Sequence, residues 1–135
     1  MAELFSTKIW DHARNPRNLG LLTDADVLVQ AGDPSQGDAF LYLFKIRDER
    51  VEAARFLAKG TPAAIAASSM ATELAIGKPL DEVLTISPAA IATALGGVPE
   101  EKMYCCRMAA TALHTAVYQY RSSEEDPVFC FATGA

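Results

Sequence analysis

Two adjacent cysteines, Cys105 and Cys106, are the residues of this sequence best suited to chemistry. Their thiolates are soft ligands of the kind that iron–sulfur clusters and zinc sites use. They stand near the start of a long helical pattern, where adjacent side chains point about 100° apart. The chain has three cysteines in all, and the third, Cys130, lies in an apolar stretch near the C-terminus. Any metal chemistry of this protein therefore centres on the cysteine pair.

Each of these thiols also has a purely structural interpretation. A buried cysteine often behaves as a small hydrophobic residue, and Cys106 lies on an apolar stripe with Ala110 and Leu113. Cys105 occupies the neighbouring face of the helix, which is rich in alanine and also points inward. For Cys130, packing or strand addition is the simpler explanation. The alternative is a tail that folds back to supply a replacement thiol.

The composition predicts a single acidic intracellular domain. The chain has 135 residues, a net charge of −5 and a pI near 4.9, which argues against nucleic acid as a partner. It lacks a long uninterrupted apolar run, so we expect no membrane span. Its first residues lack the basic start and apolar core of a signal peptide, so we expect a reducing cytoplasm and free thiols. We expect one domain over residues 1–135, with residues 121–135 as a C-terminal tail.

The order of elements predicts an α+β fold. Runs of β-branched and aromatic residues indicate three strands, and the last two are joined by a tight connection typical of a β-hairpin. The rest of the chain has helical spacing, with Thr61 as an N-cap and Pro62 in the first helical position. We expect a small antiparallel sheet of about three strands with helices packed on one face. The expected strands are 25–31, 39–47 and 51–59, and the expected helices are 3–14, 63–76, 80–86, 88–95 and 99–121.

Three segments taken together resemble the IscU/NifU-type family of iron–sulfur cluster scaffolds. The first is residues 11–20, which contain the run Asn15-Pro16-Arg17-Asn18. The second is residues 54–82, with Gly60 before an alanine-rich helix, and the third is Cys106 on the last helix. The resemblance covers about residues 5–121 and implies the fold of that family.

The resemblance also implies a ligand set, because these scaffolds hold a cluster or zinc between three cysteines and an aspartate. Asp38 remains in the first loop, where Gln36 replaces its cysteine, and Thr61 replaces the second cysteine. The third cysteine matches Cys106, and Cys105 stands at the preceding position, which is often histidine in the family. Asp38, Cys105 and Cys106 are therefore the candidate metal ligands, with Gln36 and Thr61 at the positions of lost ligands.

Neutral oxygens bind iron or zinc less well than thiolates do. We therefore expect zinc, iron or an iron–sulfur cluster to bind weakly, or not at all. The leading hypothesis is a non-enzymatic protein similar to iron–sulfur cluster assembly scaffolds. One alternative is a degenerate paralogue that acts by binding a cysteine desulfurase or another iron–sulfur assembly protein. Another is a sulfur acceptor that uses the thiol of Cys106.

Overall fold

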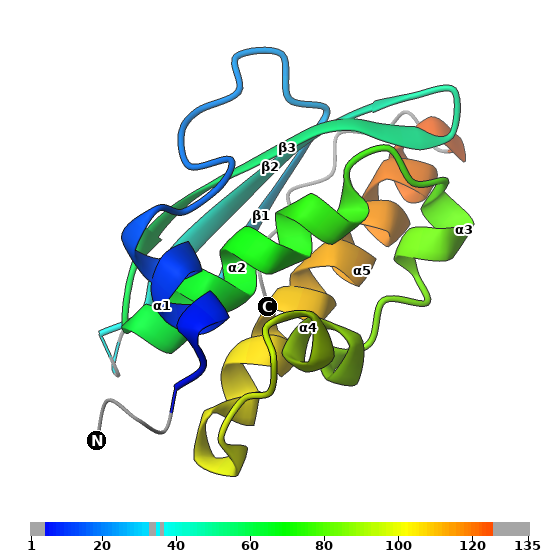
Figure 1. Ribbon diagram of the computed structural model, residues 1–135. Helices are drawn as coiled ribbons and strands as arrows, with labels where there is room; N and C mark the ends of the chain where they lie inside the picture. Colours follow the sequence, from blue (N-terminus) through cyan, green and yellow to red (C-terminus); the bar gives the residue numbers. More distant parts are fainter. Residues whose placement is uncertain (1–4, 33–34, 36, 126–135) are drawn as a thin grey trace.

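A three-stranded antiparallel sheet, in the order β1-β2-β3, carries helices over one of its faces (Figure 1). The computed structural model describes residues 5–32, 35 and 37–125. Its strands are β1 (Val27–Ala31), β2 (Ala39–Arg47) and β3 (Arg50–Lys59). Its helices are α1 (Thr7–Arg14), α2 (Pro62–Ala75), α3 (Leu80–Val83), α4 (Pro88–Ala94) and α5 (Met103–Glu125), with a 3₁₀ turn, η3 (Glu100–Lys102), before α5. The predicted α+β fold is confirmed. Within these residues, no helix combines the length and apolarity needed to cross a membrane.

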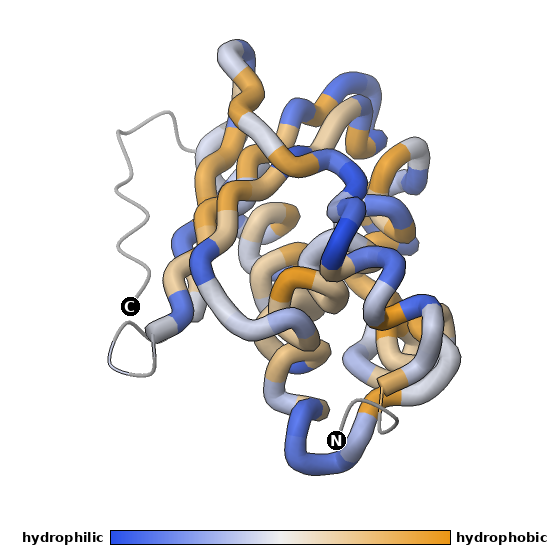
Figure 2. Tube along the Cα trace, turned by 60° about the vertical axis from the view of Figure 1, so that its left-hand side comes forward, coloured by the Kyte–Doolittle hydropathy of each residue, from blue (hydrophilic) through white to orange (hydrophobic). Residues whose placement is uncertain are grey.

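The central strand β2 supplies the aromatic centre of the core. Phe40, Tyr42 and Phe44 alternate toward the helices, and successive ring centroids lie 6.4 Å apart. Phe56 of β3 stacks on Tyr42 with ring centroids 6.2 Å apart. Figure 2 shows apolar residues concentrated along the strands and on the helices packed behind them. Because side chains alternate along a strand, one face of the sheet can be filled by large rings.

The turn after α1 is fastened to α2 by a buried polar cluster. The Ser69 hydroxyl accepts a hydrogen bond from the Arg17 backbone N–H at 2.9 Å, and it lies 2.7 Å from His12 Nδ1. Asn18, with a φ of 65°, donates from its side-chain amide to the Thr72 hydroxyl at 3.1 Å. The direction of the bond between Ser69 and His12 depends on the tautomer of the imidazole, because a hydroxyl oxygen can accept two hydrogen bonds and also donate one.

This cluster predicts a loss of stability in acid. Burial lowers the pKa of His12 below its usual value of 6.5, and the charge of Arg17 adds to the effect. The unfolded chain therefore binds a proton more readily than the folded chain, so the free energy of unfolding falls as the pH drops below about 6.5. Urea unfolding at pH 7.5 and pH 5.5 checks this, with His12→Gln as the variant that cannot be protonated. If the difference in stability between wild type and His12→Gln is the same at both pH values, the prediction is wrong.

Two loops cover the outer edge of β3. At one end, Phe56 exchanges backbone hydrogen bonds with the segment 18–20, donating to Asn18 and accepting from Gly20, both at 2.9 Å. At the other end, Val51 exchanges backbone hydrogen bonds with the segment 77–78, at 2.8 and 3.1 Å. The outward backbone groups of Phe56 and Val51 are therefore paired within the chain.

Candidate functional site

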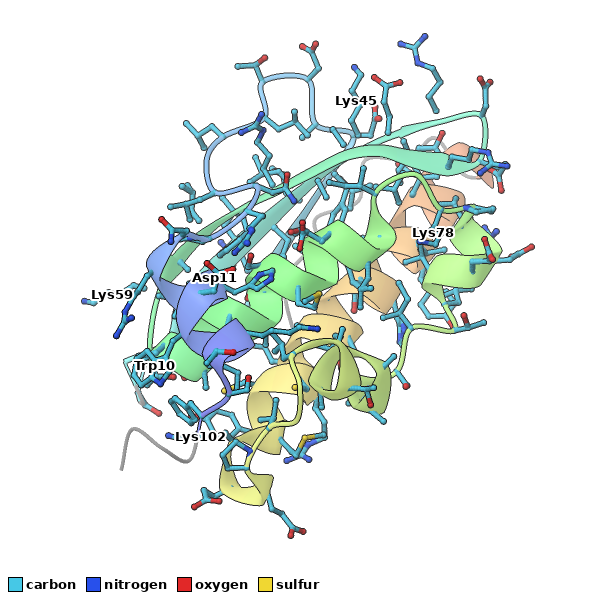
Figure 3. The ribbon with its side chains drawn as sticks, in the orientation of Figure 1. Trp10, Asp11, Lys45, Lys59, Lys78 and Lys102 are labelled. Carbon is cyan, nitrogen blue, oxygen red and sulfur yellow. The ribbon has the colours of Figure 1, made fainter. Side chains whose placement is uncertain are left out.

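Asp38, Thr61 and Cys105 come together at one end of the sheet. Asp38 directly precedes β2, and Thr61 directly follows β3 as the N-cap of α2. Cys105 lies in the first turn of α5. The negative charge of Asp38 and hydrogen bonding from Thr61 both affect the pKa of its thiol. Lys59 and Lys102 lie at this end of the molecule in Figure 3, and Lys45 and Lys78 lie toward the other. Three segments that are distant in sequence thus converge on one site.

Asp38 is held against two glycines. A Cβ atom on Gly60 would lie 2.9 Å from Asp38 Oδ1 and 3.0 Å from the ring of Phe40, so only glycine leaves room there. Gly32 has a φ of +95°, and a Cβ atom there would lie 2.9 Å from the Asp38 carbonyl oxygen. The Asp38 side chain is only 5 % exposed, and within the described part of the chain its Oδ1 has no hydrogen-bond partner. A buried carboxylate oxygen without a partner is costly, so this atom is suited to receive a cation or a donor.

The Cys105 thiol is fully buried in the core, with polar groups among its neighbours. Burial raises its pKa, and the negative charge of Asp38 raises it further. Hydrogen bonding from Tyr104, the positive charge of Lys102 and hydrogen bonding from Thr61 oppose that rise. The net direction is upward, so the thiol keeps its proton at neutral pH until a cation takes its place.

Cys106 lies in a different environment. It is fully buried within the apolar core, and burial together with the neighbouring Cys105 raises its pKa to about 11. Neither Asp38 nor Thr61 is among the groups that act on it. Both thiols are buried in the apolar core, but the charge of Asp38 and hydrogen bonding from Thr61 shift the pKa of Cys105 and are not among the causes of the shift of Cys106. Gln36, the remaining site position considered in the sequence, lies outside the described residues.

Cys130, and with it the alternative that the tail supplies a replacement thiol, also lies outside the described residues.

The environment of Cys106 predicts an inert thiol. With a pKa of about 11, roughly one molecule in ten thousand carries the thiolate at pH 7, and the sulfur is also shielded from solvent. Alkylation of Cys106 by iodoacetamide at pH 7 should be at least a hundredfold slower in the native protein than in urea. Peptide mapping by mass spectrometry checks this at single-cysteine resolution. Comparable native and denatured rates would contradict the burial and would revive Cys106 as a sulfur acceptor.

Sequence reasoning did not assign three residues to this site. In the sequence Gly60 is part of the family resemblance before the alanine-rich helix, and the structure shows that it provides the space beside Asp38. Tyr104 and Lys102 are not among the predicted site residues, although both lower the pKa of Cys105. Their signal in the sequence is proximity, since each lies within three residues of Thr61 or Cys105.

The described residues lack a preformed multidentate metal site of the usual kind. Among residues 5–32, 35 and 37–125, no group of three or more His, Cys, Asp or Glu side chains is placed to hold a metal ion. The thiol of Cys105 and the carboxylate of Asp38 therefore stand as a pair, with Thr61 as a neutral oxygen beside them. Such a pair offers one soft and one hard ligand.

Comparison with known proteins shows which chains this protein resembles in sequence and fold. The chain is 46% identical over 117 residues to "Iron-sulfur cluster assembly scaffold protein IscU 1" of Archaeoglobus fulgidus, covering 87% of this chain and 76% of that protein. It is 38% identical over 125 residues to "Iron-sulfur cluster assembly scaffold protein IscU" of Escherichia coli, covering 90% and 97%. The fold matches a NifU-like N-terminal protein from Brucella abortus with a TM-score of 0.69 at 19% identity, covering 89% of this chain and 96% of that one.

The family model described as "NifU-like N terminal domain" matches residues 4–126, which is nearly the whole chain. The matched span contains all three strands, all five α-helices and the site at the start of β2. The chain therefore belongs to the family of NifU-like N-terminal domains.

Proposed function

We propose that this protein takes part in iron–sulfur cluster assembly as a scaffold-type protein with a reduced ligand set. Its relatives at 38–46% identity bear the name of iron–sulfur cluster assembly scaffolds. The observation that carries the proposal is the buried Asp38 Oδ1, which has no partner among the described residues and lies at the site that includes Cys105. The site thus keeps an acceptor aimed at a cation even though Thr61 occupies a position where the family has a thiol.

The ligand set predicts weak and reversible binding of the cargo. A [2Fe–2S] cluster is normally held by four strong protein ligands, whereas Cys105 and Asp38 provide two. Thr61 adds a neutral oxygen, which is a poor ligand for soft iron. Because Cys105 must lose its proton to bind, iron displaces that proton, and binding strengthens as the pH rises. The protein serves as a carrier or accessory rather than as a catalyst, and a cysteine desulfurase is the partner that such a role requires.

The two neighbouring cysteines provide a matched test. The protein is mixed anaerobically with ferrous iron and sulfide, desalted, and assayed for bound iron and for visible charge-transfer absorbance. Cys105→Ser should abolish most of the bound iron, since it removes the thiol whose pKa is raised by the charge of Asp38. Cys106→Ser alters the equally buried neighbouring thiol, whose pKa neither Asp38 nor Thr61 affects, so it should retain the iron. Wild-type protein that stays colourless and free of iron under these conditions would reject the proposal.

A second candidate function is a protein-binding module without metal. The absence of any group of three metal-binding side chains in the described part of the chain favours it. In that case the protein would bind a cysteine desulfurase with the same affinity whether or not Cys105 is present. Calorimetry measures desulfurase binding by wild type and by Cys105→Ser, both without iron. Equal affinities support the protein-binding module, and weaker binding by the variant contradicts it.

A further inference from the structure

The face of the sheet that points away from the helices carries a group of leucines. Because side chains alternate along a strand, the residues between the buried aromatic residues of β2 point to this outer face. Each of the three strands contributes, and the residues that form this leucine patch are Leu28, Leu41, Leu43 and Leu57. Figure 1 shows the described helices on the opposite face, so none of them covers the patch.

The strand register places the four leucines next to one another. Leu28 of β1 lies directly opposite Leu43 of β2, and Leu57 of β3 lies directly opposite Leu41 of β2. Opposite side chains on one face have Cβ atoms about 5 Å apart, and the two pairs are offset by only two residues along β2. The leucine patch is therefore continuous across all three strands.

The leucine patch is open to another molecule. Leu28 is 51% exposed and Leu57 is 38% exposed. Leu43 is buried, but unlike the other buried hydrophobic residues of the described chain it does not belong to the main core. Contiguous exposed apolar surface marks an interaction site, whereas single exposed apolar residues need no explanation. Leu43 thus forms the floor of the patch, and Leu28 and Leu57 present its apolar surface to solvent.

The charged residues beside the leucine patch are basic. Where residues 39–45 of β2 pair with residues 53–59 of β3, the charged side chains on the outer face are Lys45, Arg55 and Lys59. Figure 3 shows Lys45 on the side of the sheet away from the helices, and its ammonium lies 3.7 Å from an exposed carboxylate oxygen of Asp24. Arg55 lies directly opposite Leu43, and neither Arg55 nor Lys59 forms an ion pair within the described residues. Positive charge thus gathers here in a chain whose net charge is −5.

These charges indicate which occupant fits the leucine patch. A second copy of this chain, packed face to face, would bring Arg55 and Lys59 toward the same cations of its partner, and like charges across an interface are unfavourable. An acidic partner would pair with them instead. Three strands spaced about 4.8 Å apart make the patch about 10 Å wide, which matches the diameter of one α-helix. A helix whose apolar stripe is flanked by carboxylates therefore complements this surface in width, polarity and charge.

We propose that the leucine patch is a docking site for an acidic amphipathic helix of a partner protein. The apolar stripe of that helix covers the leucines, and its Asp or Glu side chains pair with Arg55 and Lys59. Lys59 lies two residues before Thr61, so the docked partner reaches the end of the sheet that carries the candidate functional site. This inference is independent of the proposed function, because no metal ion takes part in it.

Two synthetic peptides provide the test. Each has about 20 residues, long enough to form a helix, with leucines at three- and four-residue spacing. One peptide carries glutamate on both sides of the leucine stripe, and the other carries lysine at the same positions. Fluorescence anisotropy with the full chain at low salt should show that wild type binds the glutamate peptide about tenfold more tightly than the lysine peptide. This preference should shrink as the salt concentration rises.

Variants on and off the leucine patch separate specific docking from general apolar adhesion. Leu28→Ser and Leu57→Ser change exposed side chains, and each should weaken binding of the glutamate peptide about fivefold. Arg55→Glu combined with Lys59→Glu should reverse the preference in favour of the lysine peptide. Tyr118→Ser changes a 62% exposed residue of α5, on the other side of the sheet, and should match wild type. Circular dichroism and urea unfolding establish that each variant is folded before binding is compared.

The possible results decide for or against the acidic helix. The proposal is overturned if wild type binds neither peptide, if it binds both equally at low salt, or if Tyr118→Ser weakens binding as much as Leu57→Ser does. Sedimentation velocity tests the second copy as the occupant, since a wild-type dimer that dissociates in Leu57→Ser would also overturn it. None of these results bears on the proposed iron binding, which is tested through Cys105→Ser.

Discussion

Cysteine restored at both lost positions, by Gln36→Cys together with Thr61→Cys, is expected to yield a protein that retains a stable iron–sulfur cluster. The double variant would add two thiolates to Cys105 and Asp38, giving the four strong ligands that such a cluster needs. Cluster-bound iron and sulfide per chain should rise on the order of tenfold over wild type, because thiolate replaces neutral oxygen at two positions. Anaerobic reconstitution followed by desalting, iron and sulfide analysis and visible circular dichroism measures the gain.

The control for this experiment separates ligation from folding. Thr61 accepts a hydrogen bond from the Ala64 backbone N–H as the N-cap of α2, and losing that cap costs about 0.5–2 kcal/mol. Thr61→Ser retains a capping hydroxyl without adding a thiol, so Gln36→Cys with Thr61→Ser should fold normally and gain little cluster. A double-cysteine variant that folds but holds no more cluster than this control would show that the site is not a reduced form of a cluster site.

Phe56→Ala is expected to cause the largest loss of stability of any single substitution considered. Phe56 is fully buried, stacks on Tyr42 and forms the backbone contacts that join β3 to the segment 18–20. Truncating a buried phenylalanine removes its transfer free energy and leaves a cavity, for a cost of about 3–5 kcal/mol. Urea unfolding at neutral pH measures it.

The neighbouring residue provides a matched control for that experiment. Leu57 follows Phe56 on β3 but faces the other side of the sheet, where it is 38% exposed. Leu57→Ala should cost clearly less than Phe56→Ala, because more than a third of the Leu57 surface stays in water and its truncation leaves no closed cavity in the core. Similar losses for the two variants would mean that the helix-covered face does not hold the main core.

Local sequence signals were sufficient to predict most of the fold. Strand β2 begins at Ala39 and ends at Arg47 as expected, because its alternating aromatic residues are bounded by turn formers on both sides. Helix α2 begins after Thr61, which caps it as expected. The helix ends were less exact: α3 stops at Val83 instead of residue 86, and α5 continues to Glu125 instead of residue 121. End positions depend on tertiary contacts that local patterns do not contain.

The site was predicted less completely, because it depends on how helix and sheet are packed. The spacing along α5 shows that Cys105 and Cys106 both point inward, and both are fully buried. It does not show which thiol faces Asp38, since that depends on the rotation of α5 against the end of the sheet. The sequence does not predict the neighbours of Gly60 and Tyr104 for the same reason. Gly60 lies against Asp38, and Tyr104 is affected by Thr61 and Asp38, which are distant from it in sequence.

The two edges of the sheet differ in how far they can pair with a strand from another molecule. Segments 18–20 and 77–79 pair with β3 at Phe56 and at Arg50 and Val51, so a further strand could not run along the whole of that edge without displacing them. Among the described residues no strand pairs with the outer side of β1, which is only five residues long. Both edges thus offer only short templates for strand pairing between molecules, which limits edge-to-edge aggregation.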